Sequence, residues 1–171
     1  FTWSITGTPN VWRLDGPKRF PVQMTGGEDP TRVSGVTPDG RTLILSRDVG
    51  GQEDPGLYVQ SADGGPLTRL HHKKGTRAFY AFTTDDSRAV YFSANDIKPD
   101  SYALYRYDLG TRERVLVFDQ PGLWGVSDHR GDAAGLTLLL SKATGALSRE
   151  YAEYDIATRT LTPLLGQNEK V

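Results

Sequence analysis

A segment of the sequence recurs every 46 to 48 residues, and this repeat restricts the fold more than any other feature of the chain. The clearest copies are Val36–Ser46 and Thr83–Ser93, each of which joins an aspartate turn to an apolar run that ends in serine. A weaker third copy begins at Val126–Asp132 and continues at Leu138–Ser141. The turn aspartates Asp39, Asp86 and Asp132 are separated by 47 and 46 residues. A period of this size is typical of β-propeller blades, each of which is a four-stranded antiparallel sheet.

Two further markers keep nearly the same interval. One is an aromatic strand and the other is the turn aspartate that follows it: Leu57-Tyr58 with Asp63, Leu104-Tyr105 with Asp108, and Glu150-Tyr151 with Asp155. Trp12 and Asp15 hold the equivalent places in an incomplete first copy. An ordinary β-sandwich has no reason to repeat its turns at this interval, so the markers favour propeller blades over accidental periodicity.

The repeat predicts an all-β fold in which residues 1–171 form a single propeller segment. The 19 glycines and 10 prolines separate short runs rich in Val, Tyr, Phe, Leu and Thr, as in many short strands joined by tight turns. An incomplete blade is expected at about 1–26, with complete blades at about 31–71, 77–119 and 122–166. The expected strands are Thr31–Val36, Thr42–Ser46, Leu57–Gln60, Leu67–Leu70, Arg77–Phe82, Ala89–Ser93, Ala103–Asp108, Arg114–Phe118, Leu123–Val126, Gly135–Ser141, Glu150–Asp155 and Thr160–Leu165.

About three and a half blades predict an incomplete ring, because closed propellers typically have four to eight. An open ring exposes blade faces and invites association, including self-association through those faces. Three explanations stay open: a piece of a longer protein, two copies that close a larger ring, or a strained four-bladed ring. The first is favoured, since Phe1-Thr2-Trp3 already has the pattern of a strand.

Composition excludes several classes of function. The formal net charge of −1 and pI near 6.3 argue against a nucleic-acid partner, and no apolar stretch is long enough to insert into a membrane. The chain has no cysteine, which excludes disulfides, thiolate metal sites and cysteine catalysis. No cofactor is predicted, and the compartment, cytoplasmic or periplasmic, stays open.

Sequence motifs for catalysis or metal binding are weak. Ser127, Asp128 and His129 contain the residue types of a catalytic triad, but neighbours on one loop rarely make an oriented relay, so a turn is expected there. His71 and His72 are expected in a solvated loop between blades rather than in a metal site with His129. The acidic pairs Asp85-Asp86 and Glu53-Asp54 lack the pattern of a calcium loop and are expected to form turns. No catalytic and no metal-binding residue is predicted.

The residues most able to contact a ligand are aromatic. Phe79, Tyr80 and Phe82 belong to the expected innermost strand of one blade, and Trp124 begins the equivalent strand of the next. Most of these side chains are expected in the core. Tyr80, Phe82 and Trp124 are the candidates for contacts in the central channel, and Arg47 is a candidate for a surface contact.

The repeat resembles that of TolB-type propellers. The resemblance is carried by Pro38–Ser46, then Gly56-Leu57-Tyr58, then Pro66–Leu70, and it covers nearly the whole chain. A similar repeat builds the N-terminal propeller of the prolyl oligopeptidase family, which includes dipeptidyl- and acylaminoacyl-peptidases. Long loops are expected at Arg47–Pro55 and Ala94–Ser101, and in this the chain resembles the peptidase propellers more than a bare TolB repeat.

The resemblance implies a gating propeller that restricts access of peptides to an α/β-hydrolase module with a Ser-Asp-His triad. This chain has neither that module nor a Gly-x-Ser-x-Gly elbow: Gly125–His129 lacks the second glycine. It also lacks the paired glutamates with which dipeptidyl-peptidase propellers hold the substrate amine. The chain is therefore expected to be non-catalytic. The alternative is a TolB-like scaffold that binds a protein or peptide. A third function, a sugar- or metal-binding propeller enzyme, would require convergent acidic or histidine clusters that this sequence lacks.

Overall fold

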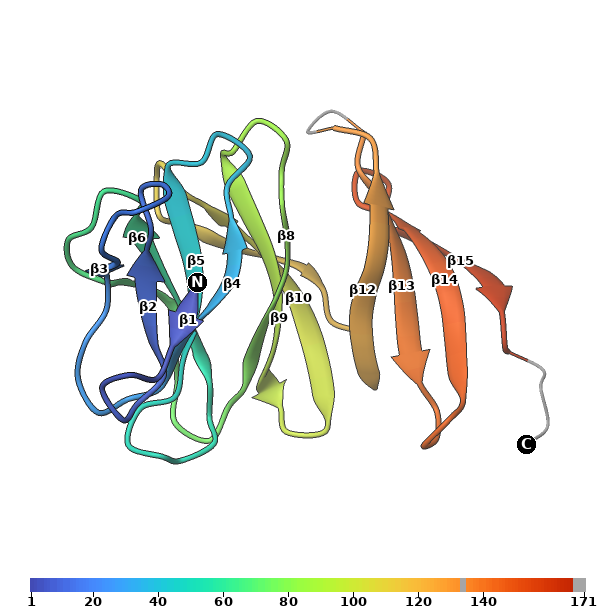
Figure 1. Ribbon diagram of the computed structural model, residues 1–171. Coiled ribbons are helices and arrows are strands. Elements are labelled where there is room, and N and C mark those ends of the chain that lie inside the picture. The colour runs from blue at the N-terminus through green and yellow to red at the C-terminus, as the bar shows by residue number, and fades with distance from the viewer. Residues whose placement is uncertain (133–134, 168–171) are drawn as a thin grey trace.

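The computed structural model describes residues 1–132 and 135–167, and this part of the chain is built from β-strands in four antiparallel sheets (Figure 1). The first sheet has three short strands, β1 (Thr2–Trp3), β2 (Asn10–Arg13) and β3 (Val22–Gln23). The incomplete first blade predicted from the sequence corresponds to this sheet.

Three four-stranded sheets follow, and in each the strands are neighbours in chain order. The second blade comprises β4 (Thr31–Val36), β5 (Thr42–Arg47), β6 (Gly56–Ser61) and β7 (Thr68–His71); the third comprises β8 (Ala78–Thr83), β9 (Ala89–Lys98), β10 (Ser101–Asp108) and β11 (Arg114–Phe118); the fourth comprises β12 (Leu123–Arg130), β13 (Thr137–Ala143), β14 (Arg149–Asp155) and β15 (Thr160–Leu165). All twelve strands predicted for the complete blades are present, and β9 and β12 extend well beyond their predicted ends.

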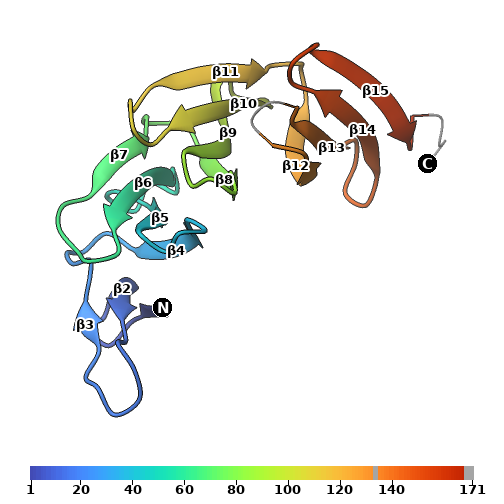
Figure 2. The ribbon, with the colours of Figure 1, turned by 90° about the horizontal axis from the view of Figure 1, so that it is seen from above.

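The sheets follow one another around an open arc (Figure 2). β4, β8 and β12 lie on the concave side of the arc, while β7, β11 and β15 lie on its convex side. This is the radial arrangement of propeller blades, whose first strands line a central channel. The described sheets do not close into a ring, which confirms the prediction of an incomplete propeller.

The first turns of the second and third blades are built from a repeated Thr-x-Asp sequence. In the second blade the Thr37 hydroxyl donates to Asp39 Oδ1 at 2.6 Å, and that oxygen also accepts the backbone N–H of Arg41 at 3.0 Å. In the third blade Thr84 and Asp86 repeat both contacts at the same distances. The residue after each aspartate has a positive φ, 72° at Gly40 and 59° at Ser87, so glycine is the less strained choice. The turn predicted at Asp39-Gly40 is confirmed.

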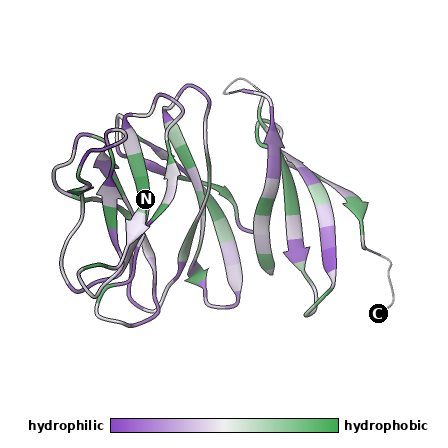
Figure 3. Cartoon of the chain, in the orientation of Figure 1, coloured by the Kyte–Doolittle hydropathy of each residue, from purple (hydrophilic) through white to green (hydrophobic). Residues whose placement is uncertain are grey.

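The core lies between successive blades. Ile44, Leu57 and Leu70 of the second blade pack with Val90 and Phe92 of the third. A second cluster joins the third and fourth blades, with these buried members: Phe82, Ala89, Tyr91, Leu104, Phe118, Leu136, Leu138, Leu140 and Tyr154. Apolar segments recur on the strands of every complete blade (Figure 3). The middle strands of the third blade are covered on both sides, because this blade stacks between the second and the fourth.

Two local expectations differ from the structure. The region expected as a long loop at Ala94–Ser101 is mostly strand, because β9 extends to Lys98 and β10 begins at Ser101. Ser127, Asp128 and His129 were expected in a turn but lie within β12, where the pairing with β13 shifts between Val126 and Asp128 in a β-bulge. Such extensions depend on pairing with the neighbouring strand, which local turn chemistry does not report.

Candidate functional site: a cleft between the third and fourth blades

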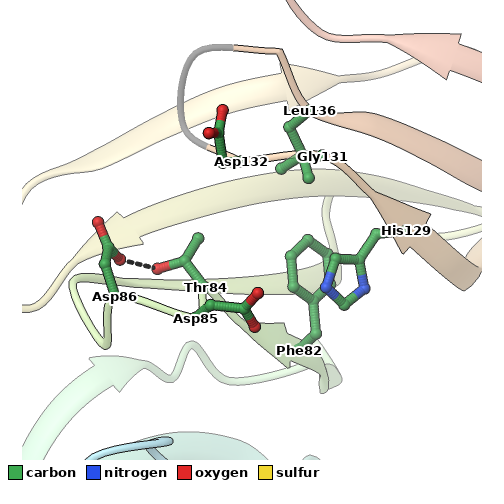
Figure 4. Close-up of a pocket in the computed structure, with 8 residues that line it drawn as sticks. All are labelled: Phe82, Thr84, Asp85, Asp86, His129, Gly131, Asp132 and Leu136. Carbon is green, nitrogen blue, oxygen red and sulfur yellow. Dashed lines mark hydrogen bonds between the residues drawn. The ribbon is translucent and has the colours of Figure 1, made fainter.

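Two cavities lie between the third and fourth blades, at opposite ends of β8 and β12. The turn cavity has a volume of about 350 Å³ and is lined by Phe82, Thr84, Asp85, Asp86, His129, Gly131, Asp132 and Leu136 (Figure 4). The aromatic cavity has a volume of about 510 Å³ and is lined by Phe79, Tyr80, Ala81, Ser93, Tyr102, Leu123, Trp124, Gly125, Val126, Ala143 and Arg149. Of the predicted contact residues, Phe82 lines the turn cavity, whereas Tyr80 and Trp124 line the aromatic cavity.

The apolar wall of the turn cavity is a stack of rings from both blades. Phe82, at the end of β8, is 7% exposed, and its ring lies parallel to that of Tyr91, with centroids 4.6 Å apart. The imidazole of His129 stacks on Phe82 with a centroid separation of 3.9 Å and an interplanar angle of 12°. The β-bulge in β12 precedes His129 and so helps to set which face of the strand this ring occupies.

The remainder of the turn cavity is acidic. Figure 4 shows Asp132 on one side of the cavity and Asp85 and Asp86 on the other, with Phe82 and His129 at one end. Asp86 is engaged in its turn, and the hydroxyl of Thr84, followed by the backbone N–H of Arg88, lowers the pKa of its carboxyl. Within the described part of the chain, no hydrogen bond or ion pair engages the carboxylate of Asp85. Three carboxylates beside an aromatic wall favour a cationic group with an apolar neighbour.

The sequence signal that marks Asp85 is a departure from the repeat. In the second blade Pro38 holds the position of Asp85, between Thr37 and Asp39, and the turn forms with the same contacts. The turn therefore does not require a carboxylate at this place. The sequence around His129 suggests only catalysis or metal binding. Its ring contact depends on Phe82, 47 residues away, which no local pattern in β12 indicates.

The aromatic cavity presents rings from neighbouring blades. Trp124 packs edge-on against Phe118, with centroids 5.2 Å apart, and its Nε1–H donates to the carbonyl of Pro121 at 3.2 Å. Tyr80 donates or accepts a hydrogen bond with the Thr83 hydroxyl at 3.1 Å. Lys142 places its ammonium 5.6 Å from the Trp124 ring centroid, a cation–π distance. This cavity suits an apolar or aromatic side chain.

Arg47, the fourth predicted contact residue, lines neither cavity. Its side chain is 16% exposed and pairs with Asp29 at 3.2 Å. The backbone N–H of Gly50, together with the guanidinium of Arg47, lowers the pKa of the Asp29 carboxyl despite the opposing effect of desolvation. These contacts tie the second blade to the segment that precedes β4.

The triad-like residues Ser127, Asp128 and His129 do not form a relay in this geometry. Asp128 Oδ1 accepts the backbone N–H of His129 at 2.8 Å, while the His129 ring faces Phe82. A Ser-His-Asp relay requires the carboxylate to hydrogen-bond the imidazole and the imidazole to hydrogen-bond the serine hydroxyl. The bulged strand directs these groups to other partners.

The histidine and acidic pairs are used in structural contacts. His71 was expected in a solvated loop, but it ends β7 with a side chain that is 8% exposed, and this expectation was wrong. His72 Nδ1 and the Tyr58 hydroxyl lie 2.5 Å apart. Asp54 accepts the backbone N–H of Gly75, 21 residues away, at 2.7 Å. In residues 1–132 and 135–167, no three His, Cys, Asp or Glu side chains are placed to hold a metal ion together.

Solved structures similar to this chain are β-propellers. TolB from Acinetobacter baumannii aligns with a TM-score of 0.60 and 20% identity, over 96% of this chain and 40% of that one. A structure from an analysis of two prolyl endopeptidases, concerned with inter-domain dynamics in catalysis and specificity, aligns with a TM-score of 0.72 and 14% identity, over 93% of this chain and 26% of that one. An oligogalacturonate lyase from Vibrio parahaemolyticus aligns with a TM-score of 0.59 and 18% identity, over 90% and 45%.

These comparisons establish the fold. All three are β-propeller structures, and the chain spans less than half the length of each. No protein-family model matches the chain, and no curated protein matches its sequence. Identities of 20% or less show a shared architecture and leave activity open. Among the described residues, none forms a helix that could cross a bilayer.

Proposed function

We propose that this chain is a non-catalytic segment of a larger propeller that positions peptides for the hydrolase module of a prolyl-oligopeptidase-like serine peptidase. The higher TM-score to the prolyl endopeptidase structure, 0.72 against 0.60 for TolB, favours this role over a free-standing scaffold. The open arc also supports it, since additional blades would cover the exposed blade faces.

The observation that carries the proposal is the turn cavity, where the unengaged Asp85 carboxylate lies near the Phe82–His129 stack. Its position between the first strands of two blades places it beside the concave side of the arc, where a peptide in the channel would pass (Figure 2). In this role Asp85 holds the α-amino group of the peptide, and Phe82 contacts the adjoining side chain. Trp124 and Tyr80 contact a residue farther along.

The test compares short peptides that differ only at the amino terminus. Isothermal titration calorimetry of a free-amine tripeptide and its N-acetylated form should show at least tenfold weaker binding after acetylation, which corresponds to about 1.4 kcal/mol. Asp85→Asn should weaken binding of the free-amine peptide to a similar extent and leave the affinity for the acetylated peptide unchanged. Asp63→Asn, which removes a fully exposed carboxylate, is the matched control. Equal affinity for the two peptides would exclude amine recognition at this cavity.

The second candidate is a TolB-like scaffold that binds a protein or peptide without an attached hydrolase. TolB has the highest sequence identity of the three solved structures described above, 20%, and its alignment covers 96% of this chain. The two functions differ in the intact protein: the first requires a reactive serine, detectable by labelling with a fluorophosphonate. A native protein that binds peptides and does not react with the label would support the scaffold.

A further inference from the structure

A basic groove lies between the second and third blades, away from the cleft described above. It has a volume of about 660 Å³, and its lining includes Arg69, His71, Lys73, Asp96, Arg112 and Arg114. One side belongs to β7 and the segment after it, and the other to β9, β10, β11 and the β10–β11 turn. β7 and β11 are on the convex side of the arc (Figure 2). The groove is therefore independent of the proposed peptide channel.

Positive charge converges on this groove from both blades. Four basic side chains line it: Arg69, Lys73, Arg112 and Arg114. Asp96 is the single carboxylate in the lining, and its two oxygens already accept the Tyr105 hydroxyl at 2.6 Å and Arg114 Nη1 at 2.9 Å. In the part of the chain that the structure describes, the guanidinium groups of Arg69 and Arg112 make no hydrogen bond or ion pair. Like charges across a shared groove repel, and a bound anion would offset that repulsion.

The inner wall of the groove carries a buried donor without a partner. His71 Nδ1 lies 2.8 Å from Arg114 Nη1, and because a guanidinium only donates, this nitrogen is the acceptor. The proton of the neutral ring is then on Nε2, which is buried and has no hydrogen-bond partner in the described structure. Asp96 Oδ2 is 3.9 Å from it, beyond hydrogen-bond distance. Burial lowers the pKa of His71, so the ring stays a neutral donor at neutral pH.

We propose that the basic groove binds a ligand carrying two or more carboxylate or phosphate groups. The guanidinium group presents paired N–H donors that match the two oxygens of either anion, and Arg69 and Arg112 are free to do so from opposite blades. A ligand with a single negative charge can engage one of these arginines, whereas a multivalent one joins both. The groove should therefore prefer ligands with two or more anionic groups over ligands with one.

The probes are citrate, pyrophosphate and acetate, titrated calorimetrically into the 171-residue chain in a phosphate-free buffer of low ionic strength. The expected result is one-to-one binding of citrate, pyrophosphate or both, at least tenfold tighter than acetate and weakened by added salt. Preference between citrate and pyrophosphate identifies the ligand as carboxylate- or phosphate-bearing. Failure of both to bind more tightly than acetate would overturn the proposal.

Matched double variants locate the binding. The double variant Arg69→Gln, Arg112→Gln should bind the preferred probe at least tenfold more weakly. The control variant Arg32→Gln, Arg88→Gln removes the same charge outside the groove, and its affinity should change less than twofold. Arg69→Lys with Arg112→Lys keeps the charge and loses the paired donors, so its affinity should fall between those of the other two variants. Circular dichroism confirms that each variant is folded. Equal weakening in the groove and control variants would show a general charge effect and overturn the assignment.

Discussion

The backbone N–H of Asp39 donates a hydrogen bond to the hydroxyl of Ser87 at 3.0 Å, joining the first turn of the second blade to the equivalent turn of the third. The two residues are 48 positions apart, close to one repeat, so the contact is made between two copies of the same turn. Ser87 makes it from a positive φ of 59°, a conformation that costs a non-glycine residue about 1 kcal/mol. The serine thus combines local strain with a contact between blades.

Substitution of Ser87 should separate these two effects. Ser87→Ala loses the hydrogen bond and keeps the positive φ, so we expect it to lower the free energy of unfolding by about 1 kcal/mol. Ser87→Gly also loses the hydrogen bond but relieves the strain, so its stability should be close to that of the parent chain. Urea denaturation followed by circular dichroism measures both. A glycine variant less stable than the alanine variant would contradict this account.

The turn aspartates should make stability depend on acid pH. The pKa values of four carboxyls, those of Asp39, Asp86, Asp108 and Asp155, lie below the ordinary value of 3.8 because turn hydroxyl and backbone N–H groups donate to them. A lowered pKa in the folded state gives stability that is present above pH 3.8 and lost as the pH falls through the folded value. Denaturation at pH 7, 5, 4 and 3 should therefore show a decline concentrated below pH 4. A constant free energy of unfolding from pH 5 to pH 3 would contradict the stabilising role of these carboxylates.

Asp96 should be a major determinant of the stability of the third blade, because its partners lie on the neighbouring strands β10 and β11. Its side chain is 8% exposed and accepts from Tyr105 and Arg114. Asp96→Ala leaves both donors without this acceptor and should cost about 3 kcal/mol. Tyr105→Phe removes one charged hydrogen bond and should cost about 1.5 kcal/mol. Arg130→Ala breaks the exposed pair with Glu153 and should cost less than about 1 kcal/mol. Thermal unfolding that ranks Arg130→Ala as the most damaging change would contradict this order.

The contact between Gly35 and Tyr80 should limit side-chain size on the concave side of the arc. A Cβ added to Gly35 would meet the Tyr80 ring at 2.7 Å, closer than carbon atoms pack. Gly35→Ala should therefore lower the free energy of unfolding by about 1 to 3 kcal/mol. In a Tyr80→Ala background the same change should cost much less, because the opposing ring is gone. Additive effects in the double variant would show that the two residues are not coupled.

The parts of the fold that the sequence predicts are those with a local cause. The turn at Asp39-Gly40 follows from a short polar side chain and a positive φ within four residues, and its repetition at Asp86 gives the period. The burial of His71 has no such local cause, because it depends on Arg114, 43 residues away, and on Asp96. The same holds for the candidate site. The sequence pattern predicts that Phe82 lies on the innermost strand of its blade, but the contact of Phe82 with His129 depends on how two blades pack.

The intact mass of the native protein, measured on material from its source, tests most directly the claim that this arc belongs to a larger propeller with a hydrolase module. The chain itself has a mass of 18.8 kDa. Our account predicts a native polypeptide of about 60–80 kDa, the size of a full propeller and one additional domain at 100–200 residues per domain. A native polypeptide of 18.8 kDa would contradict the account and leave this arc to act alone or with other copies of itself.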